Sequence, residues 1–93
     1  MKKDNDSKTK KKQKVRFLTG PEVDMLRAFG EGWETIIADC YNKIYKAIEE
    51  DTRYGPSFEF QNILQRNAVR DYFEMKKFRT YCTISGLSVR ILF

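Results

Sequence analysis

Residues 78–93 read FRTYCTISGLSVRILF, and they carry the clearest strand pattern in the sequence. Apolar residues alternate with polar ones on both sides of Ser85-Gly86, a spacing typical of strands with one buried face. Ser85-Gly86 has the composition of a two-residue turn between antiparallel strands. The stretch therefore predicts a β-hairpin that ends at Phe93. An isolated hairpin is only marginally stable, so we expect a third strand, for which Val15–Leu18 is the candidate.

A helix is predicted to begin directly after this candidate strand. Thr19 and Glu22 have the spacing of a capping box, in which each side chain accepts a hydrogen bond from the backbone amide of the other residue. From there, apolar residues recur every three or four positions as far as Ile48, as they do on one face of a helix. Gly30 and Gly32 interrupt the pattern, so we expect the long helix to be kinked or broken near Gly30.

A second helix is predicted over residues 57–76. Gly55-Pro56 ends the first helix, and Ser57 suits the N-cap of the next one. Apolar residues from Phe60 to Met75 then follow helical spacing. Two helices packed on a three-stranded sheet would give a single small α+β domain over residues 15–93.

Basic residues are concentrated at the two ends of the sequence. Residues 1–16 carry a net charge of +6, residues 17–59 carry −5 and residues 60–93 carry +4. Residues 1–14 contain no large apolar side chain after Met1, which predicts a disordered basic arm. Such an arm neutralises phosphates and binds nucleic acid without sequence preference, although a purely solubilising tail has the same composition.

The C-terminal third of the chain predicts a folded basic surface in addition to the arm. A helix with arginines that is followed by a hairpin has the order of a winged-helix recognition helix and its wing, but no compact helix-turn-helix precedes it. Arginine also suits bidentate contacts to bases and phosphates. The candidate nucleic-acid-binding residues are Lys8, Lys10, Lys11, Lys12, Lys14, Arg66, Arg70, Lys76, Lys77 and Arg79. Tyr72, Phe73 and Tyr81 are either stacking partners for single-stranded bases or aromatic residues of the core or its rim. The leading prediction is a nucleic-acid-associated binding protein, with DNA and RNA both open.

The long helix supports an alternative function, because it is acidic as well as amphipathic. A small protein of the phage or virus type could use such a helix to inhibit or recruit a larger nucleic-acid-handling host enzyme. The candidate protein-contact residues are Phe29, Trp33, Glu34 and Tyr41. A homodimer through this helix is a further hypothesis. An exposed aromatic patch on residues 26–45 would favour protein binding, whereas a basic surface joining the arm to residues 66–79 would favour nucleic acid.

Several classes of function are disfavoured by the composition. The chain has no histidine, which excludes Ser-His-Asp and Cys-His catalysis. It has no glycine-rich phosphate loop. Cys40 and Cys82 are far apart in sequence and are expected to be free buried thiols without a zinc site. We therefore expect a non-enzymatic protein without cofactor, metal or small-molecule substrate. No signal peptide or membrane span is evident, so a cytoplasmic location, or a host nucleus, is expected.

Overall fold

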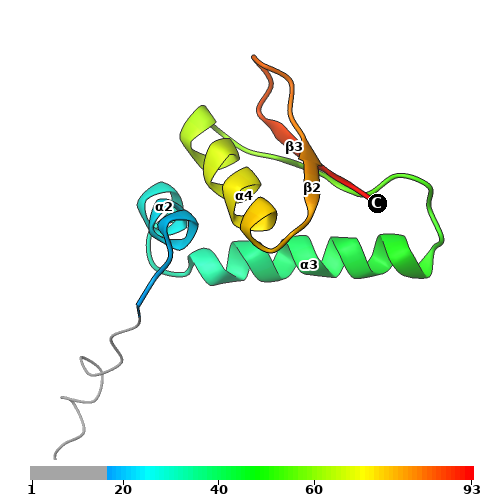
Figure 1. Cartoon of the computed structure of the whole chain (residues 1–93), viewed down its shortest axis with the longest axis horizontal. Coiled ribbons are helices and arrows are strands. Elements are labelled where there is room, and N and C mark those ends of the chain that lie inside the picture. The colour runs from blue at the N-terminus through cyan, green and yellow to red at the C-terminus, as the bar shows by residue number, and fades with distance from the viewer. Residues whose placement is uncertain (1–16) are drawn as a thin grey trace, which may run out of the picture.

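The computed structural model describes residues 17–93, which form an α+β domain of three helices and a three-stranded antiparallel sheet (Figure 1). The elements in chain order are α2 (Gly20–Phe29), α3 (Trp33–Glu49), β1 (Ser57–Glu59), α4 (Ile63–Met75), β2 (Arg79–Tyr81) and β3 (Ser88–Leu92). The α+β class and the C-terminal hairpin are confirmed. Figure 1 shows α3 running beneath both α4 and the sheet.

The long apolar stripe is divided between two helices, α2 and α3. The predicted capping box is present, with Thr19 as the N-cap of α2 and its side chain and that of Glu22 each accepting from the other's backbone amide. The backbone then turns sharply at Gly30 and Gly32, whose φ angles are 79° and 92°. Glycine adopts this left-handed region without the steric cost of a Cβ. The break that was predicted near Gly30 is therefore confirmed.

The third strand of the sheet differs from the one predicted. It is β1, at Ser57–Glu59, and it pairs with β3 so that Phe58 lies opposite Val89. Phe17 and Leu18 belong to no strand, while residues 15 and 16 lie outside the described part of the chain. Ser57 is therefore a strand residue and not a helix N-cap. The N-cap of α4 is Asn62, whose side chain accepts a 2.9 Å hydrogen bond from the Gln65 amide.

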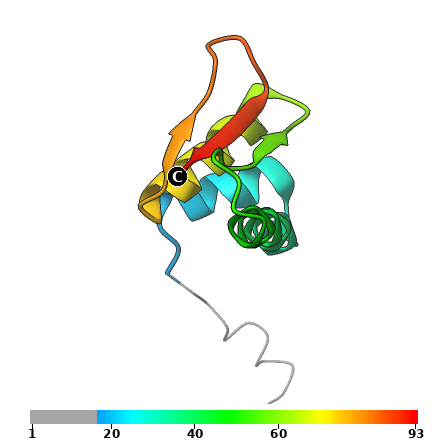
Figure 2. The same cartoon turned by 90° about the vertical axis from the view of Figure 1, so that its right-hand side faces the viewer.

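The hairpin has a longer connection than the predicted two-residue turn. Strand β3 lies at the centre of the sheet, in the order β1-β3-β2, and Thr80 of β2 pairs with Ile91 of β3. Residues 82–87 form the connecting loop, which projects beyond the helices in both views (Figures 1 and 2). The Ser85-Gly86 pair lies within this loop but does not form the whole turn.

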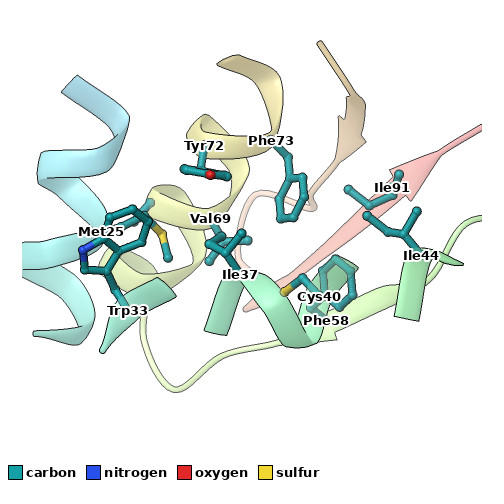
Figure 3. Packing of buried hydrophobic residues seen from close by; sticks show 11 residues of the cluster. Met25, Trp33, Ile37, Cys40, Ile44, Phe58, Val69, Tyr72, Phe73 and Ile91 are labelled. Carbon is teal, nitrogen blue, oxygen red and sulfur yellow. The ribbon is translucent and has the colours of Figure 1, made fainter. Parts of the chain in front are cut away.

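The hydrophobic core lies between the two long helices and the inner face of the sheet. Figure 3 shows Met25 and Trp33 at one end of the core and Ile44 and Ile91 at the other. Phe73 points from α4 into the space between these groups and is completely buried. The inner positions of the sheet, Phe58, Val89 and Ile91, are buried, whereas their neighbours along each strand face outward. Within residues 17–93, no helix lies in front of the outward-facing positions of β2 and β3 (Figure 2).

Candidate nucleic-acid interface

Arg66, a predicted phosphate ligand, is buried inside the domain with only 7% of its surface exposed. Its Nη1 atom donates to the carbonyl oxygens of Thr83 and Gly86, both at 2.7 Å. Its Nε and Nη2 atoms donate to the Asn67 side chain at 3.2 and 2.8 Å. Four of the five guanidinium N–H groups are thus directed at groups within the protein. The structure places Arg66 as a support for the hairpin loop.

Arg70 is partly exposed and forms an ion pair with its neighbour on α4. Its Nε atom donates to Asp71 Oδ1 at 2.9 Å, and this hydrogen bond is the main reason why the pKa of Arg70 is raised. Glu74 is exposed on the same helix and accepts a 2.7 Å hydrogen bond from the Thr80 hydroxyl. Because Asp71 and Glu74 would repel phosphates, the exposed side of α4 is poorly suited to the role of a recognition helix.

Three exposed basic residues of the C-terminal third gather where α4 ends and β2 begins. Lys76 is the C-cap of α4, and its Nζ lies 5.7 Å from the centre of the Tyr72 ring. Lys77 follows with a φ of 74°, a left-handed conformation that turns the chain toward β2. Arg79 is the first residue of β2. Lys76, Lys77 and Arg79 are called the basic corner below.

The start of the described chain lies beside the basic corner. The Thr19 hydroxyl is 3.1 Å from the sulfur of Met75, the residue that precedes Lys76. The lysines predicted to bind phosphates at positions 8, 10, 11, 12 and 14 lie outside the described residues. The described chain, which begins at residue 17, therefore enters the domain next to the basic corner.

The remainder of the domain is not basic. Residues 17–93 contain ten basic and eleven acidic side chains, a net charge of −1. The excess positive charge of the protein consequently comes from residues 1–16, and the basic corner is a local feature of an otherwise balanced domain. The acidic end of α3, at Glu49, Glu50 and Asp51, is fully on the surface.

The outer face of the sheet contains the one exposed aromatic residue among the three stacking candidates. Tyr72 and Phe73 are buried in the core. Tyr81 of β2 is 57% exposed and pairs directly with Arg90 of β3. Arg90 was not among the predicted site residues, although the alternation with Val89 and Ile91 was a sufficient signal that it faces outward.

The aromatic residues proposed for a protein interface are largely inside the domain. Trp33 is 5% exposed and packs edge-on against Tyr72, with ring centres 5.9 Å apart. Phe29 packs against Phe60, and Tyr41 packs against Phe73. The fourth candidate, Glu34, is exposed.

The second half of α3 presents other apolar side chains. Tyr45 and Ile48, one helical turn apart, are 60% and 58% exposed. An exposed aromatic patch on residues 26–45 would have favoured protein binding, and the exposed aromatic residue in that range is Tyr45, which was not among the predicted contact residues.

A hollow of about 130 Å³ lies between α3 and β1, with Cys40 in its wall. Burial raises the pKa of the Cys40 thiol to about 12, an effect that Lys43 opposes and Asp39 reinforces. A thiol with such a pKa is protonated at neutral pH and is a poor nucleophile or metal ligand. Across residues 17–93, no group of three or more Cys, Asp or Glu side chains is arranged to hold a metal ion.

No protein-family model matches the sequence, and no curated protein or solved structure matches the chain. None of the helices within residues 17–93 has the length and apolar character needed to cross a membrane.

Proposed function

We propose that the protein is a non-enzymatic nucleic-acid-binding protein of the cytoplasm, or of a host nucleus, in which the lysine-rich N-terminal segment and the basic corner contact phosphates together. The observation that carries this proposal is the 3.1 Å contact between Thr19 and Met75, which brings the start of the described chain next to Lys76 and Lys77. Seven lysines in residues 1–14 and three basic residues at the corner can then contact the phosphates of one stretch of nucleic acid. Arg66 is not part of this contact surface, because its guanidinium is already engaged within the domain.

Electrostatic attraction is the main source of affinity in this proposal. Each phosphate that a lysine or arginine neutralises releases a condensed counterion, so the affinity falls as salt concentration rises. The net charge of −1 on residues 17–93 argues against a broad basic groove. The domain would instead orient a strand that the N-terminal segment captures, with the acidic end of α3 held away from the phosphates.

A pair of lysine variants tests the contribution of the basic corner. In Lys76→Gln/Lys77→Gln, the slope of log affinity against log salt should become shallower by about 2, roughly one for each lysine removed. The matched control is Lys43→Gln/Lys46→Gln, which removes the same charge from exposed positions on α3. Equal slopes for the two double variants would show that only total charge matters and would contradict a localised contact.

Protein binding remains the second candidate because Tyr45 and Ile48 leave an apolar surface on α3. Light scattering tests the simplest form of this candidate, a homodimer through α3. A Tyr45→Lys variant should dissociate such a dimer, whereas a monomer at all concentrations would exclude it.

A further inference from the structure

We infer that the outer face of the β-sheet binds single-stranded nucleic acid, with a base stacked on Tyr81 and phosphates contacting Arg79 and Arg90. This inference rests on the proposed function and specifies its substrate as an unpaired strand. It assigns the contact to β2 and β3, and not to the exposed side of α4.

The register of the sheet brings these three residues together. Tyr81 lies opposite Arg90, and Arg79, two residues before Tyr81, lies opposite Leu92. Side chains two positions apart on a strand, and those directly opposite on a neighbouring strand, point to the same face. Val89 and Ile91 point into the core, which fixes Arg79, Tyr81, Arg90 and Leu92 on the other face. In Figure 2 no helix lies in front of β2 and β3.

Both arginines are held in place by backbone carbonyl groups at the ends of the sheet. Arg90 Nη1 donates to the carbonyl oxygen of Gly55 at 2.9 Å, and Arg79 Nη2 donates to that of Phe93 at 3.2 Å. Within residues 17–93, each of these guanidinium groups makes this one hydrogen bond, so most of its five N–H donors are not used within the domain. Holding the side chain in advance reduces the entropy lost when it binds a phosphate.

The charge distribution on the face indicates where the phosphates of a bound strand would lie. Arg79 continues the basic corner directly onto β2, so positive charge extends from Lys76 to the centre of the sheet. On the opposite edge, β1 carries the exposed Glu59. Phosphates are therefore attracted to β2 and β3 and repelled from β1. Basic side chains suit phosphates and the Tyr81 ring suits a base, so the expected ligand of this face is a nucleic-acid strand.

The chemistry of Tyr81 favours an unpaired strand over a duplex. Stacking on an aromatic ring requires the flat face of a base, which is covered by neighbouring base pairs within a duplex. Every base has such a face, so the contact does not depend on sequence. DNA and RNA share both the base face and the phosphates, so strands of both kinds are expected to bind.

Substitutions at Tyr81 separate stacking from charge, because they leave the net charge unchanged. Tyr81→Val keeps a side chain that is favourable in strands but removes the ring, whereas Tyr81→Phe keeps the ring. We would measure fluorescence anisotropy with oligo-dT and oligo-U of about 15 nucleotides, and with a duplex of the same length. Tyr81→Val should weaken binding to both single strands about tenfold or more and leave duplex binding within about twofold, and Tyr81→Phe should match the unchanged protein.

The same experiment distinguishes failure of this inference from failure of the proposed function. If the unchanged protein binds strands and duplex but Tyr81→Val binds them equally well, the protein contacts nucleic acid elsewhere and the inference is wrong. If the unchanged protein binds none of the three probes, the proposed function itself fails. Amide chemical shifts on adding oligo-dT give an independent readout, and they should change along β2 and β3. Changes confined to α3 or to α4 would overturn the inference.

Discussion

Arg66 on α4 and Gly86 in the hairpin loop are joined by a 2.7 Å hydrogen bond from the Arg66 guanidinium to the Gly86 carbonyl oxygen. The same Nη1 atom also reaches the carbonyl oxygen of Thr83, so a single buried side chain holds both sides of the loop. A buried arginine is costly unless its donors are paired, and here the loop carbonyls and Asn67 provide that pairing. The loop conformation and the burial of Arg66 therefore depend on each other.

Removing this guanidinium should destabilise the domain without directly weakening nucleic-acid binding. Arg66→Met keeps the length of the side chain but leaves the loop carbonyls without their charged donor, and should lower the free energy of unfolding by about 2–3 kcal/mol. The control is Arg70→Met, which breaks a partly exposed ion pair and should cost less than about 1 kcal/mol. Urea denaturation followed by circular dichroism measures both. Equal losses for the two variants would contradict the structural role of Arg66.

Gly55 lies where the chain enters the sheet, and it should tolerate no larger residue. A Cβ on Gly55 would overlap the carbonyl oxygen of Ile91, a backbone atom of the central strand that cannot move without disturbing the ladder. Gly55→Ala should therefore cost about 2 kcal/mol or more of unfolding free energy. Gly20→Ala is the comparison, because nothing lies within 4 Å of the added carbon. It should change stability by less than about 1 kcal/mol, as a thermal or urea melt would show.

The buried thiol of Cys40 should make the protein less stable at alkaline pH. Burial raises its pKa from 9.0 to about 12, so between these values the thiol is ionised in the unfolded chain but stays protonated in the folded one. The unfolded state then binds fewer protons, and stability falls as pH rises, by up to about 1.4 kcal/mol per pH unit. The unfolding free energy at pH 8 and pH 10.5 should therefore drop more in the unchanged protein than in Cys40→Ala. An equal drop in unfolding free energy in the two proteins would show that the Cys40 thiol is not the cause of the alkaline destabilisation.

The local signals in the sequence predicted the start of α2 and the break between α2 and α3 well. The Thr19–Glu22 capping box and the break at Gly30 depend on neighbouring residues alone, and both are confirmed. Strand β1 was missed because Phe58 and Phe60 fit a strand and a helix equally well. Residues 57–59 form a strand because Phe58 pairs with Val89, a residue 31 positions away in the sequence. The hairpin loop was predicted too short for a similar reason. Its longer conformation is held by Arg66, a residue on α4 that is distant in sequence from the loop.

The candidate site could be predicted only in part, because the sequence gives charge but not the direction of each side chain. The basic corner could be read from residues 76–79, and its exposure is as expected. Arg66 was assigned to the surface because of its charge, although it shares a helical face with the buried Val69 and Phe73. The spacing of three and seven positions between these residues was the signal in the sequence that Arg66 faces the core. The closeness of Thr19 to Met75 could not be predicted, because it depends on the packing of α2 against α4.

The most direct test of the central claim is nucleic-acid binding across a salt series, using the full chain and a version that lacks residues 1–14. Fluorescence anisotropy would be measured with single-stranded DNA, single-stranded RNA and duplex DNA. We expect micromolar or tighter binding at ~150 mM salt, and a salt slope that falls by several units when the seven lysines of the segment are removed, with weaker binding retained by the domain. Absence of binding to all three probes at that salt would contradict the account, and the N-terminal segment would then be a solubilising tail or a site for a protein partner.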